Sequence, residues 1–343
     1  MSKRYRVIPF LILAIILAGC NGGKTPSAAP VVVDTPAVVI PTDTPVPTAV
    51  PPATRILVST GNLLPEADVQ GILSSIQPLA EQSGLSVESI PGFTPELLTP
   101  DVKVAVVLPP DPGITDLAGR FPDIRFISVA IPSIQPTANL FAIGIDGPHP
   151  EWAGFVAGYI AAIITNEWRV GALTQAGSNE GLLAGDGFRN GVMFFCGLCQ
   201  KKYAPFNYDA PVMELNPNAS QPEWQPVADT FSASAVKTAY IYPGAANPEM
   251  MAYLAQGGMK LIGSQAPPDA LRPAWVATVN MDYSSGLQAV WADVISGAAG
   301  KAAPAGITIS DVDTNILTDG KMRLVNEVIA ALIAGAISPN TIQ

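Results

Sequence analysis

Apolar and polar positions divide most of the chain into short apolar runs that alternate with helical patterns. Runs bounded by Gly, Pro, Asn or Asp are typical of strands buried on both faces. The predicted strands span residues 55–60, 85–90, 102–108, 124–131, 140–145, 170–174, 212–215, 238–242, 260–263 and 275–279. Between them, apolar residues at helical spacing predict helices over residues 66–83, 114–121, 152–163, 183–195, 227–233, 248–255, 287–295 and 322–334. This alternation predicts an α/β fold with doubly wound, mostly parallel sheets.

The clearest helical pattern lies at residues 152–163, after a Gly/Pro break at residues 146–148. Its apolar face carries Trp152, Phe155 and Tyr159, and most of its other positions are Ala or Gly, so it can approach a sheet closely. The polar turn at residues 175–179 follows the next strand. Open α/β sheets bind ligands at the carboxyl ends of their strands, so this turn is a candidate binding segment.

The amino terminus has the pattern of a secretory signal. Lys3, Arg4 and Arg6 precede an apolar run at residues 7–17, which is too short for a stable membrane-spanning helix. The sequence Leu-Ala-Gly-Cys at residues 17–20 resembles the lipobox of bacterial lipoproteins. The resemblance implies removal of residues 1–19 and attachment of lipid to Cys20, which would hold the protein on a membrane surface. The alternative is ordinary secretion with an unmodified Cys20.

Composition separates the next segment from the rest of the chain. Residues 20–53 consist mostly of Pro, Thr, Val and Ala, which predicts a disordered, semi-extended tether that follows the lipidated Cys20. The formal net charge is −10. An acidic chain without a basic stripe lacks the clustered Lys and Arg that nucleic-acid phosphates require, so we expect no nucleic-acid partner.

Few residues have the context of catalytic or metal-binding groups. Cys196 and Cys199 are predicted to form a local disulfide, and a redox pair is the alternative. The single histidine, His149, lies between prolines and is expected at the surface or at a helix start. Asp282 or Ser284 is a natural cap for the helix after it, and a ligand contact is the alternative role for Asp282. Glycine-rich phosphate loops are absent, and neither paired carboxylates nor a metal-ligand cluster stands out, so we expect no enzyme activity, cofactor or metal.

With its lipobox, its tether and its two predicted α/β lobes, the chain resembles the lipoproteins of the basic membrane protein family. These are type I periplasmic solute-binding proteins of ABC importers and include purine nucleoside receptors. The segment at residues 151–162 resembles the family's "E-x-x-F-L-A-G-Y-x-A-A" helix, and residues 187–191 resemble its "GF-x-x-G" run. The resemblance extends over residues 55–339. It includes the dipeptides Val-Gly at residues 170–171 and Asp-Gly at residues 319–320, and the Ala-Gly-Ala-Ile ending at residues 334–337. The resemblance implies an amino-terminal lobe of residues 54–146 and 280–304 and a carboxy-terminal lobe of residues 147–279 and 305–341.

Three positions depart from the nucleoside-binding members of that family. The acidic and Phe-Asn motif after the first strand is replaced by residues 59–64, Ser-Thr-Gly-Asn-Leu-Leu. A "G-x-D-x-D-Q" motif is replaced by residues 263–267, Gly-Ser-Gln-Ala-Pro, and a late Lys by residues 280–283. The expected ligand is therefore a small polar solute, of which a nucleoside is one example.

The expected ligand site is a cleft between the lobes, lined by polar residues at strand ends. The predicted contacts are Thr60, Asn62, Pro110, Asp111, Gln175, Ser178, Asn179, Gly244, Ala245, Ser264, Gln265 and Asn280. An aromatic side chain is expected to stack on the solute or to belong to the core, with Phe188 and Tyr242 as the candidates. Closure is expected at hinges near residues 146–148 and after Val279.

The resemblance implies a lipid-anchored binding protein on the extracytoplasmic face of a bacterial membrane that delivers its solute to an ABC permease. Two alternatives remain open. A surface sensor would have the same fold without a transport role, and an extracytoplasmic enzyme would convert the solute that it binds.

Overall fold

The computed structural model describes residues 54–206 and 209–340. The predicted signal peptide, lipidated Cys20 and tether lie outside the described residues. Within them, no helix is long and apolar enough to cross a bilayer.

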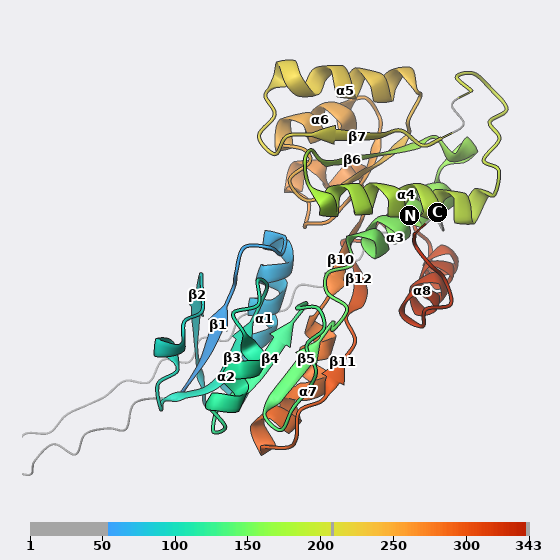
Figure 1. Cartoon of the computed structure of the whole chain (residues 1–343). Coiled ribbons are helices and arrows are strands. Elements are labelled where there is room, and N and C mark those ends of the chain that lie inside the picture. Colours follow the sequence, from blue (N-terminus) through green and yellow to red (C-terminus); the bar gives the residue numbers. More distant parts are fainter. Residues whose placement is uncertain (1–53, 207–208, 341–343) are drawn as a thin grey trace, which may run out of the picture. The chain divides into compact units, whose positions relative to one another are not determined.

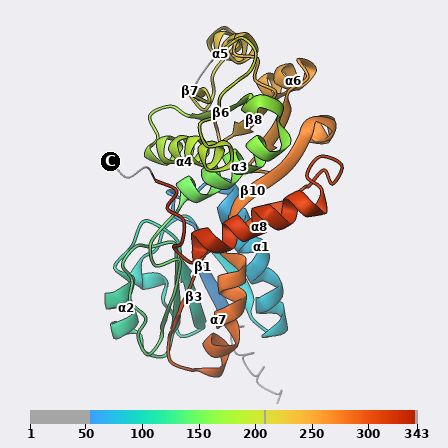
Figure 2. The same ribbon diagram turned by 90° about the vertical axis from the view of Figure 1, so that its right-hand side faces the viewer.

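The first sheet has six strands, all parallel, in the order β11-β5-β4-β3-β1-β2. Its strands are β1 (Arg55–Ser59), β2 (Ser86–Ile90), β3 (Val102–Val107), β4 (Arg125–Val129), β5 (Leu140–Ile143) and β11 (Ala302–Ala303). Its helices are α1 (Glu66–Gln82), α2 (Ile114–Arg120) and α7 (Ser284–Ser296). Figure 2 shows α1 and α7 on one face of this sheet and α2 on the other.

The second sheet also has six strands, in the order β12-β10-β9-β8-β6-β7. They are β6 (Val170–Gln175), β7 (Val212–Leu215), β8 (Thr238–Ile241), β9 (Lys260–Gly263), β10 (Trp275–Asp282) and β12 (Gly306–Ser310). Only the edge pair of β10 and β12 is antiparallel. The helices are α3 (Pro150–Ile164), α4 (Asn179–Cys196), α5 (Gln221–Ala233), α6 (Pro248–Gln256) and α8 (Asp319–Ile333). Figure 1 shows α3 and α4 on one face and α5 and α6 on the other.

Alternation along the strands explains why both sheets are covered twice. In β1, Ile56 and Val58 belong to the core beneath α1 and α7, whereas Leu57 belongs to the core beneath α2. All three side chains are fully buried. Successive side chains of a strand point to opposite faces, so a continuous apolar run needs helices on both sides. The predicted doubly wound α/β architecture is confirmed.

Helices α3 and α4 pack against each other at backbone distance. A Cβ at Gly154 or Gly158 of α3 would overlap the carbonyl oxygen of Ala184 or Phe188 in α4. The reverse holds for Gly187 and Gly191 of α4, which face the backbone of α3. Small residues therefore set the spacing of this pair. The Ala- and Gly-rich pattern predicted a close approach to a sheet, whereas Gly154 and Gly158 approach helix α4.

The structure differs from the predicted elements near the carboxyl end. Strand β10 continues beyond the predicted end at Val279 to Asp282, because residues 278–282 pair with β12. Strands β11 and β12 were not predicted. Helix α8 begins at Asp319, three residues before the predicted start at Met322. Three short 3₁₀ helices, η1 (Pro95–Leu97), η2 (Asn166–Trp168) and η3 (Asp269–Ala274), were also not predicted.

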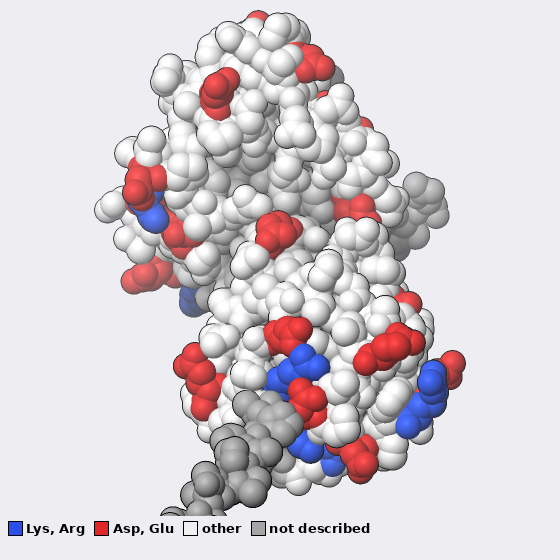
Figure 3. Space-filling view, turned by 90° about the vertical axis from the view of Figure 1, so that its left-hand side faces the viewer, with Lys and Arg blue, Asp and Glu red and all other residues white. Residues whose placement is uncertain are grey.

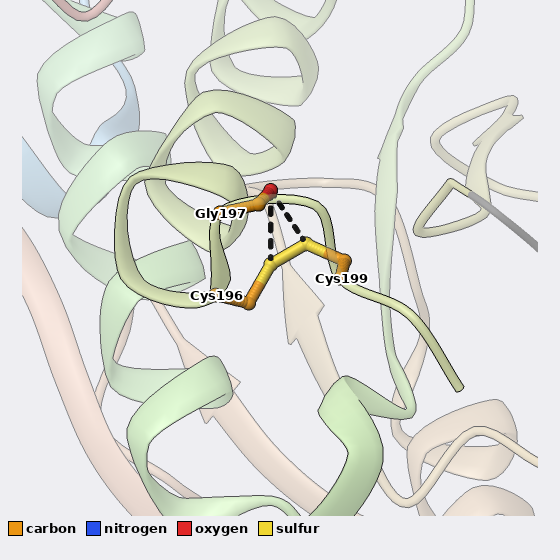
Figure 4. Close-up of a disulfide and its surroundings, with 3 residues drawn as sticks. All are labelled: Cys196, Gly197 and Cys199. Carbon is orange, nitrogen blue, oxygen red and sulfur yellow. Dashed lines mark hydrogen bonds between the residues drawn. A yellow bond between two sulfur atoms is a disulfide. The ribbon is translucent and has the colours of Figure 1, made fainter. Parts of the chain in front are cut away.

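The predicted local disulfide between Cys196 and Cys199 is confirmed. It closes the turn after α4, with the two Cα atoms 4.9 Å apart. Figure 4 shows both sulfur atoms facing the carbonyl oxygen of Gly197.

Three aromatic residues close to this disulfide in the sequence are exposed: Phe194 and Phe195 at the end of α4, and Tyr203 after it.

Candidate functional site

A pocket that is partly open to solvent is lined by residues from both sheets. It is lined by the start of α1, the start of α3, the first turn of α4, the ends of β8 and β9, and the end of β10. The lining residues are Leu63, Pro65, Asp68, Pro148, His149, Pro150, Ala153, Glu180, Tyr240, Tyr242, Pro243, Ser264, Val279, Asn280, Met281 and Tyr283. We call this the tyrosine pocket.

Helix α1 contributes a carboxylate to the tyrosine pocket. Pro65 fixes the chain at the helix start, and Asp68 stands in the first turn, where a negative charge is favourable. Asp68 is partly buried, and its carboxylate forms neither a hydrogen bond nor an ion pair with another described residue. Burial raises the pKa of the Asp68 carboxyl to about 7, because desolvation disfavours its charged form.

Strands β8 and β9 contribute two tyrosines and a serine. Tyr240 is fully buried, stacks at 6.0 Å on Phe188, and has its hydroxyl 3.3 Å from Ser264 Oγ. Ser264 Oγ also donates to the carbonyl oxygen of Ile241 at 3.2 Å. Tyr242 comes directly after β8 and is 6% exposed. The hydroxyl of Tyr240 therefore has a partner inside the protein.

The end of β10 contributes Asn280, Met281 and the residue that starts α7, Tyr283. The side chain of Tyr283 is 2% exposed, yet no described residue is a hydrogen-bond partner for its hydroxyl. A buried hydroxyl without a partner costs free energy, typically about 1–3 kcal/mol. Asp282 lies next to it, and its Oδ1 accepts from the backbone N–H of Ser285 in the first turn of α7 at 3.0 Å, whereas the N-cap residue of that helix is Tyr283.

His149 lies at the start of α3, where the tyrosine pocket meets the first residues of that helix. Its Nδ1 lies 2.9 Å from Oε1 of Glu151, and its ring stacks on Trp152 at 4.2 Å. His149 is the N-cap residue of α3, one of the two places that the sequence predicted for it, although its side chain donates or accepts no capping hydrogen bond. These contacts hold the imidazole in place at the pocket wall.

The three phenols and Asp68 influence one another electrostatically. Burial raises the pKa of the Tyr240, Tyr242 and Tyr283 hydroxyls, and the charge of Asp68 adds to the rise in each. Among the described residues that line the pocket, none is Lys or Arg. On the face shown in Figure 3, acidic side chains are scattered and basic ones lie mostly beside them.

Two of the predicted contact residues reach the tyrosine pocket: Ser264, which is buried, and Asn280, which lies within β10 rather than in a loop after it. Two others, Gly244 and Gln265, line a second pocket beside α6, which Ser264 also lines. Ala245 is buried next to that pocket. The rest line neither pocket: Thr60, Asn62, Pro110, Asp111, Gln175, Ser178 and Asn179.

Several of these residues support the local fold. Thr60 Oγ1 donates to the carbonyl oxygen of Ile90 at 3.2 Å. Asp111 Oδ1 accepts from the backbone N–H groups of Gly113 and Ile114, both at 2.9 Å, at the start of α2. Ser178 caps α4, accepting from the N–H of Gly181 at 3.0 Å. A role for them in ligand binding stays a prediction.

The two aromatic residues that were predicted as stacking candidates lie in different places. Phe188 is fully buried in the core, whereas Tyr242 lines the tyrosine pocket. Asp68, Tyr240 and Tyr283 were not predicted as site residues. Asp68 follows Pro and Glu at a helix start, where sequence alone indicates helix stabilisation. Tyr283 lies four residues after Val279, the predicted end of the late strand, and this position was the one available signal, because strand ends line such sites.

Solved structures share this fold. The chain is similar to an ABC transporter system solute-binding protein from Aeropyrum pernix K1, with 13% identity and a TM-score of 0.56 over 83% of this chain and 92% of that one. A transcriptional activator of the comK gene from Bacillus halodurans has 10% identity and a TM-score of 0.55 over 84% of this chain and 99% of that one. No protein-family model and no curated sequence matches the chain. The chain has the type I periplasmic-binding-protein fold, which serves proteins of both kinds.

Proposed function

We propose that this protein is a lipid-anchored substrate-binding protein that captures a small polar solute in the tyrosine pocket for an ABC importer. The observation that carries the proposal is the unpaired hydroxyl of Tyr283, buried in a pocket beside the unpaired carboxylate of Asp68. Buried polar groups normally have partners, so two that lack one in the same pocket favour a ligand that supplies it.

The chain connectivity is suited to a binding protein that closes on its ligand. The described chain passes between the sheets from β5 to α3, from β10 to α7 and from β11 to β12. The predicted hinge residues 146–148 and the residues after Val279 belong to the first two passages. We propose residues 54–146 with 280–304, and residues 147–279 with 305–341, as the two lobes that move.

Solute binding is tested by thermal unfolding of the purified mature protein with nucleosides, sugars, amino acids and amines, together with native mass spectrometry of any co-purifying solute. A ligand that binds the folded state raises the unfolding temperature. The Asn280→Leu variant should lose the shift, because Asn280 lines the tyrosine pocket. Gln265→Leu is the matched control, because Gln265 is exposed outside it. A shift that survives Asn280→Leu and disappears in Gln265→Leu would place binding elsewhere.

The lipid anchor rests on the lipobox at residues 17–20 and is tested separately. Cells that express the full chain should incorporate labelled fatty acid into the protein, and Cys20→Ala should abolish the label and release the protein from membranes. A labelled Cys20→Ala variant would contradict the proposal.

Transport is tested by uptake of the identified solute in cells with and without the gene. Loss of uptake on deletion supports the importer role. Unchanged uptake with intact solute binding would favour the surface sensor, and conversion of the bound solute would favour the enzyme. A family relationship to the basic membrane proteins would be supported if the identified solute were a nucleoside.

A further inference from the structure

The charges around the tyrosine pocket have one sign. Asp68 and Glu180 line it, no Lys or Arg is among its described lining residues, and the imidazole of His149 is paired with Glu151. The whole chain is acidic, with a net charge of −10. The electrostatic field of the pocket and that of the whole chain therefore both favour a positively charged ligand over a negatively charged one.

The unpaired polar atoms of the pocket accept hydrogen bonds. The carboxylate of Asp68 accepts when it is ionised, and the phenol oxygen of Tyr283 accepts or donates. An N–H group that carries a positive charge satisfies a carboxylate more strongly than a neutral hydroxyl does, because the hydrogen bond is charge-assisted. A cation would also offset the desolvation that raises the pKa of Asp68 to about 7.

The remaining walls are apolar or aromatic. The pocket is lined by four prolines, three aliphatic residues and three tyrosines; the prolines are Pro65, Pro148, Pro150 and Pro243, and the aliphatic residues are Ala153, Val279 and Met281. A polyol needs polar partners around its whole surface, and these walls offer them on few sides. A compact apolar body with one charged end is complementary to them, and aromatic rings also attract cations.

Taking the binding role proposed above as given, we propose that the tyrosine pocket selects a small organic cation whose N–H donors are held by Asp68 and Tyr283. Asp68 supplies the charge contact, and Tyr283 fixes the orientation. The solute class is thus an amine on a compact apolar body, rather than a sugar, a carboxylate or a phosphate ester.

The test uses three probes of one shape and different charge: benzylamine, benzyl alcohol and benzoate. Titration calorimetry with the mature protein should show benzylamine binding at least about tenfold more tightly than the other two at about pH 8. Asp68→Asn should remove this preference, and Tyr283→Phe should weaken benzylamine by about tenfold. Glu180→Gln is the companion variant, and it should have a smaller effect because Glu180 is exposed.

The pH dependence adds a second readout. The other titratable residues that line the pocket are Glu180, His149, Tyr240, Tyr242 and Tyr283, and Glu151 acts electrostatically on Tyr283. A bound cation lowers the pKa of Asp68, so binding releases a proton and benzylamine affinity should rise from about pH 5.5 to about pH 8. This slope should vanish in Asp68→Asn and persist in Glu180→Gln.

Each outcome decides between the two proposals. Benzyl alcohol or benzoate binding as tightly as benzylamine would overturn the cation proposal, and so would a neutral or anionic co-purifying solute that the Asn280→Leu variant loses. In both cases the binding role stands. No probe binding and no solute in native mass spectra would overturn the binding role together with the cation proposal.

Discussion

Helix α3 belongs to two regions that are built in opposite ways. Along α4 its glycines let two backbones meet, and a single added methyl group would overlap the neighbouring helix. At its amino end, Pro150 and Ala153 line the tyrosine pocket, where Asp68 and Tyr283 have no partner among the described residues. The first region is packed for stability, since close contact leaves no free space. The second gives up stability, which is typical of a binding site.

The largest expected effect lies in the packed region. Gly158→Ala places a Cβ against the carbonyl of Phe188, and we expect it to lower the free energy of unfolding by about 3 kcal/mol or more, measured by urea denaturation. Gly71→Ala in α1 is the control. That position has open space and helical backbone, so alanine should stabilise by about 0.5–1 kcal/mol. Equal effects at the two glycines would show that the α3–α4 spacing is not set by backbone contact.

The second largest expected effect is a pH dependence of the free energy of unfolding, which Asp68 in the tyrosine pocket causes. The pKa of Asp68 is raised in the folded state to about 7, from about 3.9 in the unfolded chain. The folded state therefore holds the proton more tightly, and Asp68 lowers stability progressively as the pH rises between these values. A rise of the pKa from about 3.9 to about 7 corresponds to about 4 kcal/mol at pH 8, and solvent screening of the partly exposed carboxylate reduces this value. Asp68→Asn should therefore be more stable than the wild type by about 2 kcal/mol at pH 8 and nearly equal to it near pH 4. Thermal unfolding across this range measures it, and a variant less stable at pH 8 would contradict the burial of an unpaired charge.

A smaller effect separates a structural contact from a ligand contact. Ser178→Ala removes the cap of α4 and should cost about 1 kcal/mol of unfolding free energy, because the N–H of Gly181 loses its acceptor. Solute affinity should stay unchanged, since Ser178 does not line the tyrosine pocket. Calorimetric binding and urea denaturation of the same variant measure both quantities. Lost affinity with unchanged stability would restore Ser178 as a ligand contact.

The smallest expected change in stability is at Tyr283. Tyr283→Phe removes a buried hydroxyl without a partner, so the ligand-free variant should be as stable as the wild type or more stable by up to about 1 kcal/mol. Tyr240→Phe is the control, because it breaks the contact with Ser264 and should destabilise by a similar amount. A clear loss of stability in Tyr283→Phe would mean that its hydroxyl already has a partner in the ligand-free protein.

Local patterns were enough to predict most of the fold. The mostly apolar run of β3, which Lys103 alone interrupts, and the spaced apolar positions of α1 and α3 determine their elements by themselves. Strand β12 escaped prediction because its exposed edge gives it no continuous apolar run, and β11 has only two residues. Strand β10 was ended too early because Asn280 is polar, whereas pairing with β12 extends it.

Most residues of the site could not be predicted from the sequence, for a physical reason. Asp68, Tyr240 and Tyr283 come from three separate elements, and their proximity arises only when both sheets are in place. Whether a tyrosine hydroxyl has a partner is a property of the packed protein that no local pattern encodes. Polar residues at strand ends were the signal available, and it found Ser264 and Asn280.

The most direct test of the binding role is a crystal structure of the mature wild-type protein with the tightest-binding solute from the screen. We predict electron density for that solute in the tyrosine pocket, with donor atoms about 3 Å from the carboxylate of Asp68 and the hydroxyl of Tyr283. Density for the solute at another place, with both groups still unpaired, would contradict the account.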